Sequence, residues 1–182
     1  MFRHCLLACA AALLLLPAAA RATPVFTDLY GHGCALVEKD QQGASSTRRC
    51  QGTAGFALLV HENAGRSSVD IVAPGRRVYQ LDLWDVVEPG MTQLGRKAEW
   101  QLVEGKPRAL LMRVDMIDGS SVHYPRTGTA IAVARIDADG ACVTFTVDAD
   151  ARGAQDAARR AARDRSRKCM GAYMGAALPT PM

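Results

Sequence analysis

Residues 97–116, KAEWQLVEGKPRALLMRVDM, carry the clearest β-strand pattern in the chain. This stretch contains two runs in which apolar and polar residues alternate, separated by Gly105-Lys106-Pro107. In each run the apolar side chains share one face: Ala98, Trp100 and Leu102 in the first run, and Leu110, Met112, Val114 and Met116 in the second. A period of two residues is typical of a β-strand with one buried face, and glycine with proline is typical of a turn. We therefore predict two adjacent strands, with Trp100 in the core.

Similar patterns continue on both sides of this stretch. Residues 129–136 form a nearly continuous apolar run, and a short turn at 137–140 joins them to an alternating run at 141–147. Earlier runs lie at 54–60, 69–73 and 78–83, and a polar loop or hairpin is expected at 35–53. About seven short strands separated by turns predict a mainly β domain, either an antiparallel sandwich or an open barrel.

The spacing of the apolar residues changes near the C-terminal end of the chain. Alanines recur there every three or four residues: Ala154, Ala157, Ala158, Ala161 and Ala162. This spacing predicts one α-helix over about residues 153–169, so the fold class is mainly β with one C-terminal helix (α+β). Arg159, Arg163 and Arg167 add a basic stripe to this helix. We take these three arginines as candidate partner-binding residues, with a solvated helix face as the alternative.

The first 22 residues have the pattern of a secretory signal peptide. A short polar start is followed by an apolar run at 6–16, by Pro17 and by Ala20-Arg21-Ala22. We expect cleavage before Thr23, which leaves a single exported domain of residues 23–182 in the periplasm or outside the cell. The apolar run has about 11 residues, whereas a membrane span needs roughly 20. Lipid attachment at Cys9 is a weaker alternative, because almost no apolar segment precedes that cysteine.

Four cysteines remain after this cleavage: Cys34, Cys50, Cys142 and Cys169. An even number of cysteines in an exported chain predicts two disulfides. Four cysteines allow three pairings, and we favour Cys34–Cys50 with Cys142–Cys169 because each bond closes a local loop. A metal site is the alternative, but the sequence has no C-x-x-C and no histidine at ligand spacing beside a cysteine pair.

The charge of the exported chain is nearly balanced. Removing Arg3 and Arg21 with the signal peptide lowers the formal net charge from +4 to +2. A domain with so little excess charge is not expected to bind nucleic acid as a whole. No other segment is apolar and long enough to span a membrane.

Few residues suggest chemistry. Ser121 and His123 place a hydroxyl near an imidazole, and Asp82 and Asp85 flank Trp84 as in some sugar sites, but neither pair forms a recognised motif. For both, and for His61 at a strand end, we favour an ordinary surface or half-buried position. Asp137 and Asp139 lack the further ligands of a calcium loop and are expected in a hairpin turn. We therefore expect no catalytic residues, no metal and no cofactor.

The layout of several motifs resembles a group of small exported proteobacterial proteins of unknown function. The motifs that carry this resemblance are Cys50-Gln51-Gly52, Gly55-Phe56, Ala98-Glu99-Trp100-Gln101-Leu102, Gly105-Lys106-Pro107, Gly140-Ala141-Cys142 and the Ala/Arg helix ending at Cys169. The resemblance covers nearly all of residues 23–182 and implies one domain with two disulfides. It implies no activity.

These observations favour a non-enzymatic periplasmic or secreted domain that binds a cell-envelope partner. That partner would be an envelope protein or an anionic glycan or lipid surface. An inhibitor of a lysozyme-type hydrolase is the first alternative, based only on size, β-content and disulfides. A hydrolase that uses Ser121 with His123, or Asp82 with Asp85, is the second alternative, and an enzyme is less expected than a binding domain.

Overall fold

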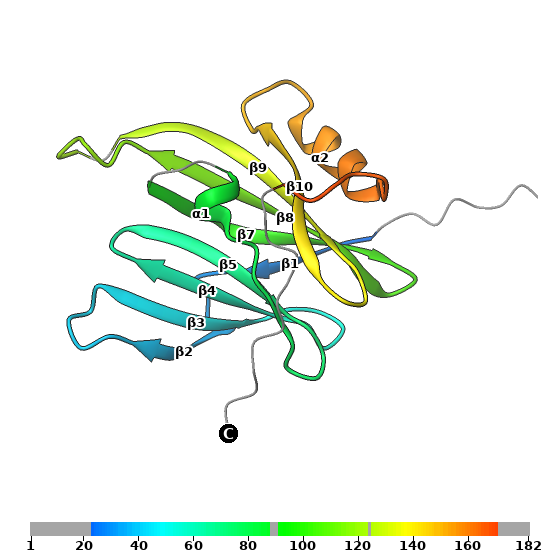
Figure 1. Cartoon of the computed structure of the whole chain (residues 1–182), viewed down its shortest axis with the longest axis horizontal. Coiled ribbons are helices and arrows are strands. Elements are labelled where there is room, and N and C mark those ends of the chain that lie inside the picture. Colours follow the sequence, from blue (N-terminus) through cyan, green and yellow to red (C-terminus); the bar gives the residue numbers. More distant parts are fainter. Residues whose placement is uncertain (1–22, 88–90, 124, 171–182) are drawn as a thin grey trace, which may run out of the picture.

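The structure, a computed structural model, describes residues 23–87, 91–123 and 125–170. Within these residues, ten strands form two antiparallel five-stranded sheets that lie one over the other (Figure 1). The sheets do not close into a barrel. Of the two predicted architectures, the sandwich is therefore the one observed. The predicted signal peptide, residues 1–22, lies outside the described residues.

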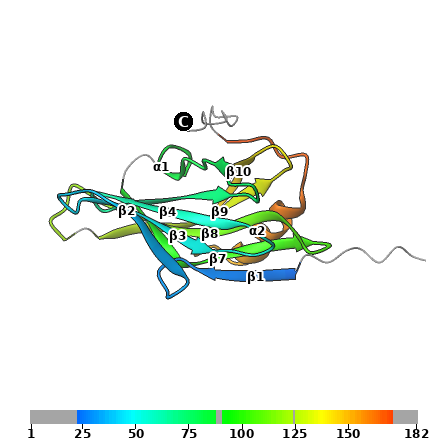
Figure 2. The same ribbon diagram turned by 90° about the horizontal axis from the view of Figure 1, so that it is seen from below.

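The first sheet has the strand order β1-β7-β8-β9-β10. Its strands are β1 (Thr23–Asp28), β7 (Met91–Val103), β8 (Lys106–Ile117), β9 (Arg126–Ile136) and β10 (Ala141–Asp148). The second sheet has the order β2-β3-β4-β5-β6. Its strands are β2 (Cys34–Lys39), β3 (Ser45–Gln51), β4 (Ala57–Asn63), β5 (Arg66–Val72) and β6 (Val78–Tyr79). Figure 2 shows β1 beside β7 at one edge of the sandwich.

The predicted strands of residues 97–116 form the β7–β8 hairpin, with Trp100 opposite Leu110. Its turn lies at Glu104 and Gly105, whose φ angles are both positive, 52° and 74°. Two such angles are typical of the two-residue turn whose twist suits the strands that it joins. Pro107, predicted in the turn, is already inside β8 at an irregularity of the register, where a residue without an N–H is tolerated.

The inner faces of the two sheets enclose the main core, in which Trp100 is the largest buried side chain, as predicted. The indole N–H of Trp100 donates to Thr27 Oγ1 at 2.9 Å. The Thr27 hydroxyl donates in turn to the carbonyl oxygen of Gln51 at 3.2 Å. The surrounding apolar side chains come from both sheets: Leu58, Val60, Val69 and Ile71 from the second, and Leu94, Leu110, Met112 and Val114 from the first. Through these two hydrogen bonds, Trp100 on β7 is linked to β1 and, by way of Thr27, to β3.

The structure differs from the prediction at residues 78–83. Only Val78 and Tyr79 form a strand, and the chain then enters the single-turn helix α1 (Leu83–Val86). Asp82 has φ 47° and ψ 47°, a left-handed conformation that ends the extended backbone before α1. Trp84 therefore lies on α1, where it is half-buried as predicted.

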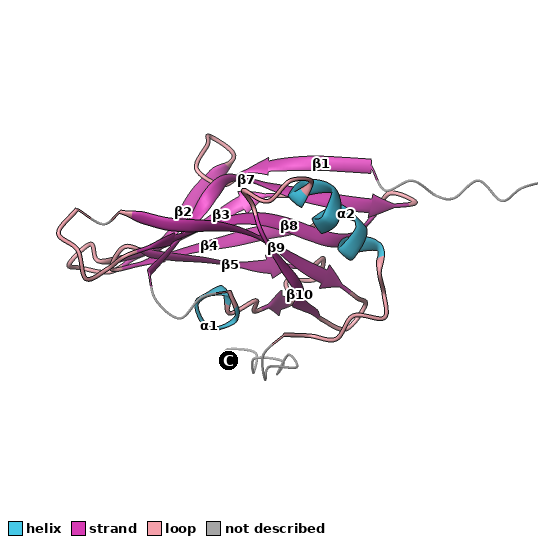
Figure 3. Ribbon diagram, turned by 90° about the horizontal axis from the view of Figure 1, so that it is seen from above, coloured by secondary structure: helices cyan, strands magenta, loops and turns pink. Residues whose placement is uncertain are grey.

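Helix α2 (Ala154–Arg163) covers the outer face of the first sheet through its alanines (Figures 1 and 3). It is shorter than the predicted range of 153–169. The helix ends where the carboxylate of Asp164 accepts hydrogen bonds from the N–H and the hydroxyl of Ser166, at 3.1 and 2.6 Å. Such local side-chain bonds replace helical bonds. The segment that follows brings Cys169 to Cys142 on β10.

Both predicted disulfides, Cys34–Cys50 and Cys142–Cys169, are present. Cys34 lies opposite Cys50 in the hairpin of β2 and β3, which confirms the expected hairpin. Structural disulfides persist in oxidising compartments, so they indicate an extracytoplasmic location. Among the described residues, no helix combines the length and the apolar character needed to cross a bilayer.

Replacing Cys142 and Cys169 together by serine removes a bond across 27 residues of chain. Because the unfolded chain gains freedom, the free energy of unfolding should fall by about 3.5 kcal/mol, measured by urea denaturation. Amide hydrogen exchange should also become faster in α2, which the bond holds near the sheet. The matched control replaces Cys34 and Cys50, and equally fast exchange of α2 in both variants would contradict this role of the bond.

Candidate ligand-binding site

The first candidate arginine, Arg159, holds α2 to the first sheet. Its Nε and Nη2 donate to Oε1 and Oε2 of Glu99 at 2.8 and 3.2 Å. Glu99 comes from β7, its side chain is only 6% exposed, and it also accepts a hydrogen bond from Gln155 at 2.8 Å. The bond to Glu99 raises the pKa of Arg159 above its ordinary value. Arg159 is thus engaged within the fold.

The other two candidate arginines have different surroundings. Arg163 is exposed near the end of α2. Arg167 lies beyond the helix, where its guanidinium carbon is 4.4 Å from the centroid of the Phe145 ring and its Nε is 3.3 Å from the Asp164 carboxylate. Of the three arginines, Arg163 alone has no ion pair with a described residue.

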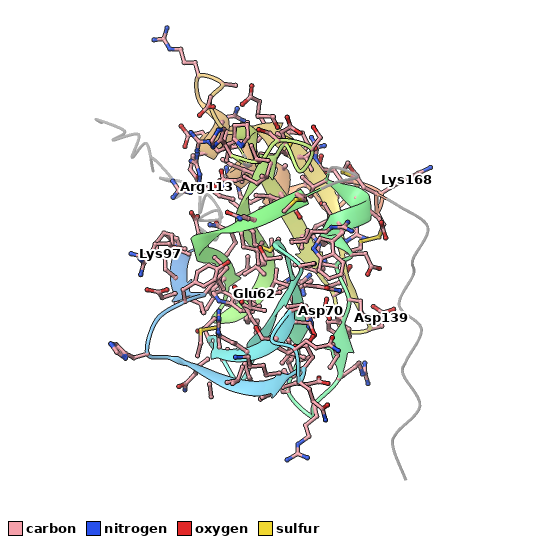
Figure 4. All side chains as sticks on the ribbon, turned by 90° about the vertical axis from the view of Figure 1, so that its left-hand side faces the viewer. Glu62, Asp70, Lys97, Arg113, Asp139 and Lys168 are labelled. Atoms are coloured by element: carbon pink, nitrogen blue, oxygen red, sulfur yellow. A yellow bond between two sulfur atoms is a disulfide. The ribbon has the colours of Figure 1, made fainter. Side chains whose placement is uncertain are left out.

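Two adjoining grooves open at the end of the second sheet where β2 and β4 end and β3 and β5 begin. The smaller, of about 320 Å³, is here called the acidic groove, and its lining includes Thr47, His61, Asp70, Asp82, Trp84 and Asp85. The larger, of about 530 Å³, is here called the Arg66 groove, and its lining includes Tyr30, Arg66, Ser67 and Gln93. Ser45, Ser46 and Glu62 line both grooves. Figure 4 views the molecule from this end and labels Glu62 and Asp70, which come from the neighbouring strands β4 and β5.

A hydrogen-bonded chain of three side chains crosses the acidic groove. Thr47 on β3 lies opposite His61 on β4, and Thr47 Oγ1 is 3.1 Å from the ring Nδ1. The ring Nε2 is 3.0 Å from Oδ2 of Asp70 on β5. The backbone N–H of Leu81 donates to Oδ1 of Asp70 at 3.3 Å. These contacts fix the imidazole between a hydroxyl and a buried carboxylate, which is the order of groups in a catalytic triad.

Asp82 brings a further carboxylate to the same groove. Its backbone is left-handed, a conformation that aspartate and asparagine adopt more readily than most non-glycine residues. Asp82 occupies the N-cap position of α1, but its side chain forms no capping bond and no ion pair with a described residue. The Asp82 carbonyl oxygen accepts the backbone bonds from Asp85 and Val86 that start α1, so the carboxylate itself is left for the groove and Asp82 is a candidate binding residue.

The acidic groove has an excess of negative charge. It holds five carboxylates: Glu38, Glu62, Asp70, Asp82 and Asp85. Burial raises the pKa of Asp82 above its ordinary value of 3.8, and repulsion from Asp70 and Asp85 raises it further. Glu62 is paired with Arg48 at 3.0 Å. The uncompensated charge around Asp82 suits a cationic ligand.

Arg66 and Trp84 meet where the two grooves adjoin. The guanidinium carbon of Arg66 is 5.2 Å from the centroid of the Trp84 ring. Arg66 has no ion pair with a described residue. Arg66 Nε and Trp84 Nε1 are both buried and have no hydrogen-bond partner among the residues that the structure describes. Unpaired buried donors are uncommon in folded proteins and require an explanation.

The structure does not bring the other sequence candidates together with this site. Ser121 and His123 lie in the β8–β9 connection, where the Ser121 hydroxyl accepts a bond from the backbone N–H of His123 at 3.4 Å. Asp137, in the β9–β10 turn, pairs with Arg135 at 2.8 Å and also with Arg165. Ser121 and His123, and likewise Asp137, thus lie in connections between strands, as expected.

Within the described ranges, no three His, Cys, Asp or Glu side chains are grouped so that they could hold a metal ion. No protein-family model, curated protein or solved structure matches the chain. The candidate site is therefore defined by its own geometry.

The grouping of Thr47, His61 and Asp70 was missed in the sequence. The signal that could have found it is the turn at Ala64 and Gly65, whose φ angles are both positive, 48° and 84°. A two-residue turn fixes the register of the strands that it joins. From that register, His61 and Asp70 follow as neighbours on one face of the sheet.

Arg159→Ala leaves the buried Glu99 without its charged partner, so the free energy of unfolding should fall by about 2 kcal/mol. Arg163→Ala is the matched control, because it removes an exposed cation from the same helix and should change stability by less than about 0.5 kcal/mol. Urea denaturation measures both values. Equal effects would show that the Glu99 contact does not hold α2 to the sheet.

Asp82→Asn should make the folded protein more stable at neutral pH. Since the pKa of Asp82 is raised on folding, its ionisation costs stability as the pH rises from 3.8 through the raised pKa. The neutral amide avoids this cost and tolerates a left-handed backbone. The gain in the free energy of unfolding should therefore shrink as the pH is lowered toward 3.8. A gain that does not depend on pH, or a loss at neutral pH, would contradict this prediction.

Proposed function

We propose that this protein is a non-enzymatic extracytoplasmic domain that binds a cell-envelope partner in the acidic groove. The group that it recognises is a cation, such as the lysine or arginine side chain of a partner protein. The observation that carries this proposal is Asp82, a carboxylate that has no ion pair with a described residue and faces repulsion from Asp70 and Asp85.

A bound cation would relieve this repulsion. In a partly buried groove, the attraction between an ammonium or guanidinium group and a carboxylate exceeds its value in bulk water. Hydrogen bonds between charged groups are also stronger than those between neutral groups. The energetic cost of holding Asp82 in place is thus offset in the bound state.

The same charges disfavour acyl transfer at Thr47. The chain Thr47–His61–Asp70 could move a proton from the hydroxyl to the imidazole. Acyl transfer, however, develops negative charge on the carbonyl oxygen, which hydrolases stabilise with hydrogen-bond donors. Asp82 and Asp85 line this groove and would repel that oxygen. The electrostatics therefore support binding of a cation over hydrolysis.

The location of the protein fits an envelope partner. The two disulfides indicate an oxidising compartment, and the signal peptide proposed at residues 1–22 would deliver the chain to the periplasm or the exterior. Partners there include envelope proteins with exposed basic segments.

The proposal predicts that a tetralysine peptide with blocked ends binds the full chain, whereas a blocked tetraglutamine peptide does not. Asp82→Asn should weaken tetralysine binding about tenfold, equal to about 1.4 kcal/mol, because a charged hydrogen bond is lost. The fluorescence of Trp84, identified by its loss in Trp84→Phe, should report the binding.

Asp150→Asn is the matched control, since Asp150 is exposed after β10, away from the groove, and has the same charge. This variant should bind tetralysine as the wild type does. Equal affinity for the two peptides, or an equal loss in both variants, would refute the proposed function.

A further inference from the structure

We infer that the ligand is a zwitterion: a short peptide whose cationic side chain lies in the acidic groove and whose carboxylate pairs with Arg66 in the adjoining groove. The cationic half of this inference rests on the proposed function. The anionic half rests on separate observations of the Arg66 groove.

The first observation is that the Arg66 groove contains one uncompensated positive charge. Its charged lining residues are Arg66 and Glu62. Glu62 is not free to neutralise Arg66, because Nη1 and Nη2 of Arg48 bind its two carboxylate oxygens at 3.3 and 3.0 Å. Arg66 itself has no ion pair with a described residue. A guanidinium group in such a setting is suited to an anion.

The second observation is that the rest of this groove would not repel an anion. Burial raises the pKa of Tyr30, so its phenol stays uncharged at neutral pH. The Tyr30 hydroxyl donates to the carbonyl oxygen of Leu94 at 3.4 Å, and the Ser67 hydroxyl accepts a bond from the Leu94 N–H at 2.7 Å. Ser45, Ser46 and Gln93 add neutral polar groups. The lining is thus polar, with its one free charge on Arg66.

The third observation is the contact between Arg66 and Trp84. Stacking on an aromatic ring holds a guanidinium group in one plane, which prepares it to bind a planar carboxylate through two nitrogens. A phosphate group is commonly surrounded by several cations or backbone donors, whereas this groove offers one free arginine. A carboxylate is therefore the anion that fits.

The fourth observation is the position of the two grooves. They share three lining residues, and Arg66 of one groove contacts Trp84 of the other. Charges of opposite sign that have no ion pair with a described residue thus lie in adjoining spaces. A simple cation would leave Arg66 unpaired, and a simple anion would leave Asp82 unpaired. A peptide with both charges satisfies both grooves, whose volumes are each in the range of small-ligand sites.

The test compares matched peptides by isothermal titration calorimetry on the full chain. Each peptide has an acetylated N-terminus, one lysine and then one, two or three glycines, and each is made with a free C-terminal carboxylate and as the C-terminal amide. At least one free acid should bind about tenfold more tightly than its amide, because the carboxylate gains charged hydrogen bonds to Arg66. Arg66→Gln should abolish this difference and leave the affinity for the amide unchanged.

Two further variants make the outcome decisive. Arg66→Lys keeps the charge but loses the planar fork, so it should retain only part of the preference for the acid. Arg113→Gln is the matched control, since it removes an exposed arginine from β8 of the first sheet and should keep the full preference. Thermal unfolding confirms that each variant is folded.

The results separate this inference from the proposed function. If the amides bind and no free acid binds more tightly, or if Arg66→Gln keeps the preference for the acid, the zwitterion inference is wrong and the proposed function stands. If neither the amides nor the acids bind, both fail.

Discussion

The burial of Trp100 between the two sheets links them at the centre of the core. Its indole N–H bonds to Thr27 on β1, and Thr27 bonds to the backbone of Gln51 on β3, so one chain of hydrogen bonds crosses from the first sheet to the second. The backbone also passes close to the ring. A Cβ added to Gly52 would lie 2.8 Å from the Trp100 ring, which a real side chain essentially never does. The loop before β4 therefore requires glycine at this point.

The two outer faces of the sandwich have different roles. On the first sheet, α2 closes the face with alanines and with the contact between Arg159 and Glu99. At the end of the second sheet, β3, β4 and β5 leave polar side chains in open grooves, and Gln93 and Leu94 of β7 also line the Arg66 groove. Helix α2 thus contributes to the fold through Arg159, and the charges proposed to bind a ligand lie at the second sheet. The sequence alone did not indicate that the helix would cover one sheet and that the grooves would lie at the other.

The fold was largely predictable because the strands have strong alternation. Residues 97–116 and 129–147 place apolar side chains on one face at every second position, and both hairpins form there. The strand predicted at 78–83 was wrong beyond Tyr79, because Asp82 takes a left-handed conformation that no local propensity favours strongly. Strand β1 was not predicted, since its six residues gain their stability from pairing with β7. Contacts of this kind are distant in sequence and leave no local pattern.

The mainly β class and the C-terminal helix follow from the sequence, because alternation and helical period are local properties of the chain. Loop closure favoured the observed pairing of the four cysteines but left the other two pairings open. The sequence also indicated Asp82, Trp84 and Asp85 as residues of interest, as they are close in sequence. The presence of Thr47, His61 and Asp70 in the same groove, and of Arg66 in the next, became apparent only from the folded chain. The physical reason is that strand register and the packing of α1 beside β5 set which charges become neighbours and which of them remain unpaired.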